Sequence, residues 1–435
     1  MTTTFTVEAG GSLLGSLRVP GDKSISHRSI MLGALAEGRT TITGFLDGED
    51  CLATLAAFQD MGVPIERPES NTVIVDGVGL TGLKPPSGPL DMGNSGTAMR
   101  LMCGVLAGQD FDSTLVGDAS LNRRPMRRVT EPLARMGARI DTEDDGTPPL
   151  RIHGGQRLRG QEHALAVASA QVKSALLLAG LWSEGETCVT EPAPTRDHTE
   201  RMLRGFGCPV RRDRGTACVT GGGPLRAGSV DIPADISSAA FFMVGASIAQ
   251  GSDMLLRHVG VNPTRTGVID ILRLMGASIE VLDRHEIGGE PVADLRVRWA
   301  PLKGIAIPRE LVPLAIDEFP ALFVAAACAE GKTVLTGAEE LRVKESDRIQ
   351  VMADGLAVLG VDCEVLPDGL RIQGRPTLAG GEVRSHGDHR IAMAFAMAAL
   401  RADAAVTIRD CDNVATSFPD FARLARHAGL GITAA

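Results

Sequence analysis

The feature of this sequence that most limits its fold is an internal repeat that extends over nearly the whole chain. Each copy has a polar start, an apolar run of helical character, a turn at a glycine or its substitute, and a β-rich stretch. The copies begin at Asp22, Gly93, Ser169, Asp235, Ile316 and Gly387. A period of about 70 residues in which helix and strand alternate predicts an α/β protein of six repeated units.

A second helix-like run in each copy ends close to a glycine. These glycines are Gly62, Gly137, Gly207, Gly276, Gly360 and Gly429. Glycine is typical of the position just past a helix, because it adopts the left-handed conformation there without a steric cost. We therefore expect each unit to run helix, strand, helix, strand.

The polar residues that open the first helix of each copy indicate an anion-binding surface. They are Ser24, Asn94, Gln171, Ser237, Asp317 and Asp388. The first turn of a helix has backbone N–H groups without partners inside the helix, and it carries the positive end of the helix dipole. Several such ends facing one cleft would form a receptacle for negatively charged groups.

Charge and composition narrow the class of ligand. The chain of 435 residues is 44% hydrophobic and 22% charged, which is typical of a folded protein of two or three domains. A formal net charge of −9 argues against nucleic acid or an anionic membrane as the partner. The basic residues are nevertheless clustered, which favours a small, highly charged anion. The clusters are Lys23 with Arg28, Arg123 and Arg124 with Arg127 and Arg128, Lys344 with Arg348, and Arg390.

Two further features concern the cellular compartment. The start "MTTTFTVEAGG" lacks the basic region and the apolar run of a secretion signal, and no run of 18 apolar residues occurs. We therefore expect a cytoplasmic protein. The eight cysteines are scattered singly, without a CxxC pair. In a chain of this size we expect reduced thiols, with neither a disulfide framework nor a structural zinc site.

Several motifs allow both a functional and a structural interpretation. "GVGLTG" (77–82) has the glycine spacing of a dinucleotide-binding turn, but prolines follow it instead of a helix, so we interpret it as an ordinary turn. "GDKSISHRS" (21–29) lacks the spacing of a phosphate-binding P-loop; its cation and hydroxyl donors could bind anions or cap a helix. "SHGDHRIAM" (385–393) contains two histidines, but no other His or Cys cluster supports a metal site.

Two segments with carboxylate side chains are equally open. In "LRVKESDRI" (341–349), Leu341, Lys344, Glu345 and Arg348 would share one face of a helix. That face could be solvated and joined by ion pairs, or it could present two cations and a carboxylate to a ligand. In "IDEFP" (316–320), Asp317 is either a helix cap or a carboxylate that acts as a base.

Taken together, the motifs resemble one enzyme family. "GDKSISHR", "GNSGTAMR", "RRPMRR", "SAQVKSALLLAG", "IDEFPAL", "LRVKESDR", "GDHRIAM" and "ATSFPDF" occur in this order along essentially the full chain. They resemble the 5-enolpyruvylshikimate-3-phosphate synthases of the shikimate pathway. The resemblance implies a two-domain inside-out α/β barrel with three repeats per domain. Residues 1–20 with 236–435 would form one domain and 21–235 the other, with the active site in the cleft between them.

The resemblance also implies roles for individual residues. Asp317 would accept the proton of the 5-hydroxyl of shikimate 3-phosphate, and Glu345 would protonate the methylene carbon of phosphoenolpyruvate. Lys23 would contact both substrates and share in catalysis. The residues implied for shikimate 3-phosphate are Lys23, Ser24, Arg28, Ser169, Ala170, Gln171, Arg196, Asp317 and Lys344. Those implied for phosphoenolpyruvate are Lys23, Gly96, Arg124, Gln171, Arg348 and Arg390.

Some positions depart from the pattern of many family members. His27 stands where many have Asn, Thr416 where many have Lys, and Arg196 where many have Tyr. These departures resemble the family's second sequence class, in which tolerance of glyphosate is common. Gly96, in contrast, is typical of sensitive members. We expect Gly96→Ala to weaken glyphosate binding more than phosphoenolpyruvate binding.

Two other functions remain open at this stage. A UDP-N-acetylglucosamine enolpyruvyltransferase would share the fold and the donor, but it normally has a reactive cysteine in a loop near the donor arginine, and "SLNRRPMRR" has none. A non-catalytic anion-binding protein on the same fold would be expected to lose Asp317 or Glu345, and both are present. The resemblance implies no cofactor, no metal and a monomer that acts on small molecules.

Overall fold

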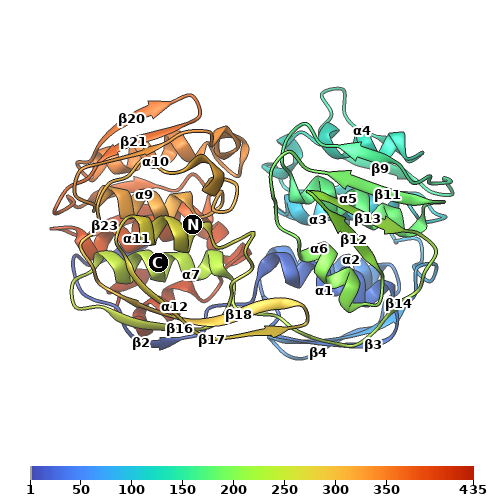
Figure 1. Cartoon of the computed structure of the whole chain (residues 1–435), viewed down its shortest axis with the longest axis horizontal. Coiled ribbons are helices and arrows are strands. Elements are labelled where there is room, and N and C mark those ends of the chain that lie inside the picture. Colours follow the sequence, from blue (N-terminus) through green and yellow to red (C-terminus); the bar gives the residue numbers. More distant parts are fainter. Residues whose placement is uncertain (1) are drawn as a thin grey trace. The chain divides into compact units, whose positions relative to one another are not determined.

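The computed structural model describes residues 2–435, and the chain divides into two compact units (Figure 1). Unit 1 contains the N-terminal residues through Pro20, Pro233–Glu286 and Pro291–Ala435, and unit 2 contains Gly21–Ile232 and Ile287–Glu290. The division at Ile232 falls a few residues before the expected boundary at 235. Its physical reason is packing: Ile232 belongs to the hydrophobic core of unit 2, whereas Ala234 belongs to that of unit 1.

Unit 2 repeats one pattern of sheet and helices. One sheet has the order β14 (Leu225–Arg226), β3 (Ala36–Thr43), β5 (Thr72–Val78), β4 (Ile65–Glu69), with β15 (Ser229–Asp231) also on β3. Another has the order β6 (Leu90–Asp91), β7 (Ser113–Val116), β9 (Leu150–His153), β8 (Arg139–Asp141). The third has the order β10 (Glu162–Ala164), β11 (Glu186–Thr190), β13 (Thr216–Thr220), β12 (Val210–Asp213). The helices are α1 (Lys23–Leu35), α2 (Glu49–Asp60), α3 (Gly96–Leu106), α4 (Arg127–Arg135), α5 (Ala170–Ala179) and α6 (His198–Gly205).

Unit 1 has the same organisation. One sheet has the order β22 (Gly381–Arg384), β23 (Val406–Arg409), β1 (Phe5–Val7), β24 (Ile432–Ala434). A second has the order β17 (Ser278–Ile287), β18 (Glu290–Arg298), β16 (Asp253–Gly260), β2 (Leu14–Leu17). The third has three strands in the order β19 (Lys332–Leu335), β21 (Gly369–Gln373), β20 (Asp362–Leu366). The helices are α7 (Ile236–Ile248), α8 (Gly267–Leu274), α9 (Phe319–Ala327), α10 (Arg348–Val358), α11 (His389–Ala398) and α12 (Phe421–Ala428).

The strand pairings and the helix ends confirm the predicted repeat. In each unit 2 sheet, three strands pair antiparallel and a strand at one edge pairs parallel to its neighbour. The glycines expected just past the second helix of each copy all have positive φ, from 78° at Gly360 to 110° at Gly429. Each therefore ends its helix as the sequence predicts.

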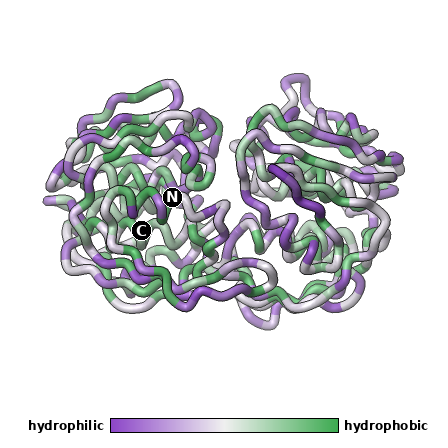
Figure 2. Tube along the Cα trace, in the orientation of Figure 1, coloured by the Kyte–Doolittle hydropathy of each residue, from purple (hydrophilic) through white to green (hydrophobic). Residues whose placement is uncertain are grey.

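The helices of unit 1 that open the repeats lie inside, and the sheets lie around them (Figure 1). All thirteen residues of α7 and all nine of α9 are buried, and α7, α9 and α11 pack on one another. Such helices are apolar on every side (Figure 2), because no face meets water. The N-terminal ends of these helices carry Asp235, Glu318 and Asp388. The fold thus holds polar groups at fixed positions on a rigid apolar support.

In residues 2–435 no helix combines the length and the apolar character needed to cross a membrane.

The expectation of reduced thiols is wrong for one pair. Cys188 and Cys218 form a disulfide, whereas the other cysteines of residues 2–435 are not disulfide-bonded. The two residues are 30 positions apart in the sequence, and they come together because β11 and β13 pair in a register that places them opposite each other. That register depends on tertiary structure, and scattered single cysteines do not reveal it.

Candidate active site

In unit 2, the start of α1 holds the first predicted site residues in different environments. Asp22 caps the helix by accepting a hydrogen bond from the Ile25 N–H at 2.9 Å. Lys23 forms an ion pair with Asp50, and its side chain remains 19% exposed. The Arg28 side chain is buried and donates to Thr199 Oγ1 at 2.7 Å, Ser174 Oγ at 2.8 Å and the Ser24 carbonyl at 2.8 Å.

Arg28 therefore joins α1 to α5 and α6. Burial lowers the pKa of Arg28 to about 10, although the carboxylate of Glu200 opposes this effect. The structure places the guanidinium in an internal hydrogen-bond network, so its effect on a ligand would include the positioning of neighbouring groups.

The starts of α3 and α5 are linked by side chains. Gly96 is the first residue of α3, after the cap Ser95. A methyl group on Gly96 would lie 3.0 Å from Arg100 Nη1 and 3.1 Å from Arg124 Nη1. Arg100 donates to Gln171 Oε1 at 2.6 Å, and Gln171 Nε2 donates to Thr97 Oγ1 at 2.8 Å.

Three predicted residues, Gly96, Arg124 and Gln171, are thus brought together. Arg100 joins them although the sequence reasoning gave it no role. The sequence could have indicated Arg100, because it lies four residues after Gly96 and therefore one helical turn along α3.

A buried ion-pair cluster supports the start of α5. Ser169 caps this helix, accepting from the Val172 N–H at 3.4 Å. Lys173 Nζ lies 2.7 Å from Glu191 Oε2 and 2.8 Å from Glu200 Oε1, and all three side chains are almost completely buried. The contact with Glu200 is an ion pair without hydrogen-bond geometry. The cluster anchors the loop that follows β11 to α5.

That loop, residues 191–197, carries Arg196. At its far end, Asp197 pairs with Arg201 at 2.8 Å and with Arg212 at 2.6 Å. The positive charge of Arg196 contributes to lowering the pKa of Arg28, after the larger effect of burial. Arg196 and Arg28 therefore affect each other's electrostatic environment within unit 2.

His27 stands inside the same end of unit 2. Its Nδ1 lies 2.7 Å from Thr54 Oγ1, and its Nε2 lies 3.3 Å from Ser95 Oγ. Complete burial, reinforced by the charges of Lys23 and Arg28, holds the pKa of His27 well below its ordinary value. His27 is therefore a neutral link between α1, α2 and the cap of α3.

In unit 1, the predicted catalytic carboxylates meet on one arginine. Arg348, at the start of α10, donates to Asp388 Oδ2 at 2.8 Å, to Glu345 Oε2 at 2.6 Å and to Asp317 Oδ1 at 3.3 Å. Burial alone would lower the pKa of Arg348, but these three carboxylates outweigh it and raise that pKa above its ordinary value. The guanidinium is therefore a permanent cation at the centre of the cluster.

Two further cations surround Asp317. Lys344 Nζ lies 3.4 Å from Asp317 Oδ1, and Arg390 Nη1 donates to the Asp317 carbonyl at 3.2 Å. Asp317, Lys344, Glu345, Arg348 and Arg390 are thus brought together as one set.

The expected helix over 341–349 is wrong. Residues Glu339–Val343 form a 3₁₀ turn, Lys344 is extended, and α10 begins at Arg348 after its cap Asp347. Lys344 and Glu345 reach Asp317 and Arg348 because an irregular segment folds around them. The helix-cap interpretation of Asp317 is also wrong: Glu318 occupies the cap position of α9, without a side-chain cap hydrogen bond.

Two other sequence features have local explanations. Thr416 is buried, and its hydroxyl donates to the Asn413 carbonyl at 2.7 Å, so it serves a turn. Within residues 2–435, the group of His, Cys, Asp or Glu side chains close enough to hold a metal is Glu186, Cys188 and Cys218, in which both sulfurs belong to the disulfide.

Comparison with known structures first defines the class of protein. The enolpyruvyl transferase NikO from Streptomyces tendae superposes with a TM-score of 0.79 at 18% identity, over 100% of this chain and 99% of that one, so the fold is that of an enolpyruvyl transferase. An EPSP synthase from Acinetobacter baumannii superposes with a TM-score of 0.90 at 58% identity, over 100% of both chains.

The sequence comparisons identify the family. The model of EPSP synthase (3-phosphoshikimate 1-carboxyvinyltransferase) matches residues 7–424. The 3-phosphoshikimate 1-carboxyvinyltransferase of Alkalilimnicola ehrlichii is 69% identical over 99% of this chain and 96% of its own length. That of Methylococcus capsulatus is 68% identical over 98% of both. The chain belongs to the EPSP synthase family, which confirms the resemblance seen in its motifs and the two-domain α/β fold.

Proposed function

We propose that this chain transfers the enolpyruvyl group of phosphoenolpyruvate to the 5-hydroxyl of shikimate 3-phosphate and releases inorganic phosphate, as a step of the shikimate pathway. Family membership supports the reaction. The observation that supports the residue roles is the cluster in which Arg348 holds Asp317 and Glu345 within hydrogen-bond distance, beside Lys344. The cluster combines two carboxylates for proton transfer with cations suited to phosphate and carboxylate groups.

The chemistry requires two proton transfers in each of its two steps. In the addition step, the 5-hydroxyl oxygen bonds to C2 of phosphoenolpyruvate while Asp317 takes the hydroxyl proton and Glu345 delivers a proton to C3. The product is a tetrahedral ketal phosphate. In the elimination step, C3 loses a proton to the Glu345 carboxylate, the double bond re-forms, and phosphate leaves C2. Asp317 passes the proton that it took to the departing phosphate, so both carboxyl groups return to their starting states. Each positioned acid or base contributes roughly 10²- to 10⁴-fold to the rate.

The proposal assigns a set of residues to each substrate. Lys23, Ser24, Arg28, Ser169, Ala170, Gln171, Arg196, Asp317 and Lys344 bind shikimate 3-phosphate, and Lys23, Gly96, Arg124, Gln171, Arg348 and Arg390 bind phosphoenolpyruvate. Arg100, which donates to Gln171, positions that amide for its ligand. The charge-assisted hydrogen bonds of such a site contribute roughly 1.5–3 kcal/mol each.

Phosphate release tests the function directly. Purified protein is given phosphoenolpyruvate with shikimate 3-phosphate, and in parallel with UDP-N-acetylglucosamine. We expect release with shikimate 3-phosphate alone, and a fall in kcat of roughly 10²- to 10⁴-fold in Asp317→Asn and in Glu345→Gln. Asp420→Asn is the matched control, because Asp420 pairs with Arg423 on an exposed surface of unit 1. Release with the nucleotide sugar, or equal rates in Asp317→Asn and the control, would contradict the proposal.

The proposal extends to partners and location. The net charge of −9 argues against nucleic acid as a partner. The family resemblance favours a cytoplasmic monomer that uses neither cofactor nor metal. Light scattering after gel filtration measures the oligomeric state, and activity after exhaustive treatment with a chelator tests the independence from metal. A dimeric mass or a loss of activity that Mg²⁺ restores would contradict these two statements.

A further inference from the structure

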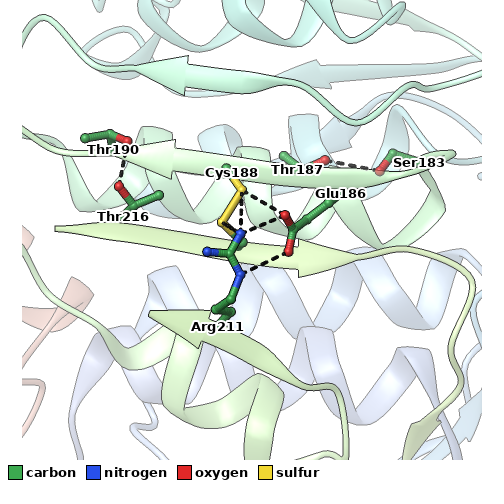
Figure 3. The surroundings of a disulfide bond; sticks show 8 residues. Ser183, Glu186, Thr187, Cys188, Thr190, Arg211 and Thr216 are labelled. Carbon is green, nitrogen blue, oxygen red and sulfur yellow. Dashed lines mark hydrogen bonds and ion pairs between the residues drawn. A yellow bond between two sulfur atoms is a disulfide. The ribbon is translucent and has the colours of Figure 1, made fainter. Parts of the chain in front are cut away.

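The disulfide of unit 2 lies on the outer face of its sheet. Cys188 on β11 and Cys218 on β13 are cross-strand partners (Figure 3). In the next pair on that face, the hydroxyl groups of Thr190 and Thr216 form a hydrogen bond of 2.7 Å. Residues on the opposite face of β11, such as Val189, are fully buried in the core of unit 2. Because successive side chains of a strand alternate between faces, the two sulfurs lie on the side away from that core.

An exposed ion pair covers the two sulfurs. Arg211 Nη2 lies 3.2 Å from Cys218 Sγ, 3.7 Å from Cys188 Sγ and 2.8 Å from Glu186 Oε2. The side chains of Arg211 and Glu186 are 59% and 43% exposed, whereas Cys188 and Cys218 are only 8% and 2% exposed. Figure 3 shows the guanidinium facing both the disulfide and the carboxylate. A surface arginine can swing away at little cost, so a reagent can reach the disulfide without unfolding the sheet.

Cysteines outside the disulfide have a different character. Burial raises the pKa of Cys103, Cys328 and Cys411 to about 12 in each case, which suppresses the reactive thiolate form. The pair at Cys188 and Cys218 instead lies beside a guanidinium, the type of neighbour that stabilises a thiolate. Thiolate chemistry is therefore more favourable at this pair than at Cys103, Cys328 or Cys411.

We propose that Cys188 and Cys218 form a reversible thiol–disulfide site that exchanges electrons with dithiol reagents, and that Arg211 stabilises the thiolate formed at Cys218. A thiolate of the reagent attacks Sγ of Cys188, the more exposed of the two residues. The bond between the two protein sulfurs breaks, and Cys218 leaves as a thiolate that faces Arg211. The second thiolate of the reagent then attacks its own sulfur in the mixed disulfide and releases Cys188. Two electrons pass from the dithiol to the protein, and the reagent ends as a disulfide.

Glu186 makes the two sulfurs unequal. Its carboxylate lies 3.4 Å from Cys188 Sγ, so it disfavours negative charge on that sulfur and can accept a hydrogen bond from the Cys188 thiol once the disulfide is reduced. Arg211 is closer to Cys218. The reduced pair thus consists of a thiol at Cys188 and a thiolate at Cys218.

The disulfide also lies close to the loop that carries Arg196. Strand β11 ends at Thr190, and the next residue, Glu191, pairs with the buried Lys173. The bond between β11 and β13 fixes one end of the loop 191–197. Its reduction would give the loop more freedom, and this consequence for substrate binding rests on the proposed role of Arg196 for shikimate 3-phosphate.

Thiol titration tests the site without reference to activity. The folded protein is equilibrated in buffers of reduced and oxidised dithiothreitol, free thiols are alkylated, and the peptides with Cys188 and Cys218 are quantified by mass spectrometry. We expect one two-electron transition in which both cysteines change together. Reduction should proceed at the same rate with and without a low, non-denaturing concentration of urea. A pair that stays oxidised until the protein unfolds, or two thiols that never oxidise, would overturn the proposal.

The role of Arg211 has a matched control. Arg211→Gln keeps a polar side chain over the sulfurs but removes the charge, and we expect reduction to be about three- to tenfold slower because the leaving thiolate is less stable. Arg39→Gln removes an equally exposed arginine, 59% exposed and paired with Asp76 in the same unit, and should leave the rate unchanged. Equal rates in the two variants would exclude the assigned role of Arg211.

The double variant Cys188→Ser with Cys218→Ser tests the effect on the loop. We expect the concentration of shikimate 3-phosphate at half-saturation to rise about threefold with kcat unchanged. This is the effect expected if the length of flexible loop that binding must order roughly doubles. The reduced wild-type protein should match this variant, and reoxidation should restore the original value. Equal half-saturation in all forms would remove the link to the loop. Absence of activity in the untreated wild-type protein would instead contradict the proposed function. The thiol titration would still test the redox site.

Discussion

Replacing Lys173 by methionine tests whether the buried ion-pair cluster stabilises unit 2. Lys173 is completely buried, and its ammonium group lies 2.7 Å from Glu191 and 2.8 Å from Glu200. The two carboxylates, 6% and 1% exposed, would lose the cation that compensates their removal from water. Breaking a buried pair by deleting one partner typically costs about 3–5 kcal/mol, so we expect the free energy of unfolding of unit 2 to fall by about this amount.

The chain offers a separate fluorescent reporter for each unit. Trp182 lies in unit 2 and Trp299 in unit 1. In a Trp299→Phe background, urea unfolding followed by fluorescence therefore reports on unit 2 alone. Lys84→Met is the matched control, because Lys84 is exposed in the same unit and the substitution is chemically identical. We expect Lys84→Met to change the free energy of unfolding by less than about 1 kcal/mol.

A second variant distinguishes lost charge balance from poor packing. Lys173→Met combined with Glu191→Gln and Glu200→Gln removes the uncompensated charges together with the cation. We expect it to recover most of the lost stability, because replacing a whole buried ion cluster is often close to neutral. A loss in Lys173→Met no larger than in Lys84→Met would refute the reasoning. A triple variant as unstable as the single one would assign the effect to packing.

Other contacts give further expectations. Gly96→Ala should raise the inhibition constant of glyphosate more than the KM of phosphoenolpyruvate. The added methyl group would lie 3.0 Å from Arg100 Nη1, so the guanidinium must move. Equal changes in both constants would contradict this prediction. The lowered pKa of His27 means that the unfolded chain takes up a proton below pH 6.5 while the folded protein does not, so unit 2 should lose up to about 1.4 kcal/mol per pH unit as the pH falls from 6.5. Urea titrations at several pH values should show a shallower slope in His27→Gln, and an unchanged slope would be the contrary result. Arg348→Met should lower the free energy of unfolding of unit 1 by about 3–5 kcal/mol, because it removes a buried cation. Arg371→Met removes an arginine from an exposed pair with Glu364 and should lower it by only about 0–1 kcal/mol. Urea unfolding followed by the fluorescence of Trp299 measures both, and similar losses in the two variants would count against a buried charge centre.

The repeat could be predicted from the sequence because it has a strong local signal. A long apolar run after a polar residue, and a glycine just past a helix, depend on the chemistry of a few neighbouring residues. The same local evidence misled at 341–349. Leu341, Lys344, Glu345 and Arg348 have helical spacing, but their side chains meet because a 3₁₀ turn and an extended residue fold around Arg348. Spacing alone does not distinguish a helix face from a loop whose charges share one centre.

The features that the sequence did not reveal depend on contacts between distant segments. The disulfide requires the register of β11 on β13, two strands that α6 and β12 separate along the chain. The internal role of Arg28 requires Thr199 and Ser174, which lie on other helices. Arg100 was visible inside a motif, but its contact with Gln171 appears only when α3 and α5 pack side by side. Each case involves a pairing that no local pattern encodes.

The complete burial of α7 has a consequence for amide hydrogen exchange. None of its thirteen residues has a solvent-facing side, so its central amides should exchange only when the whole of unit 1 opens. The strand β17, in which most residues from Glu280 to Glu286 are exposed, should exchange by local fraying at much lower free energy. In unit 1 the buried helices, and not the sheets around them, should therefore be the slowest part to exchange. The carboxylates at the ends of α9 and α11 would then stand on the most persistent part of the molecule.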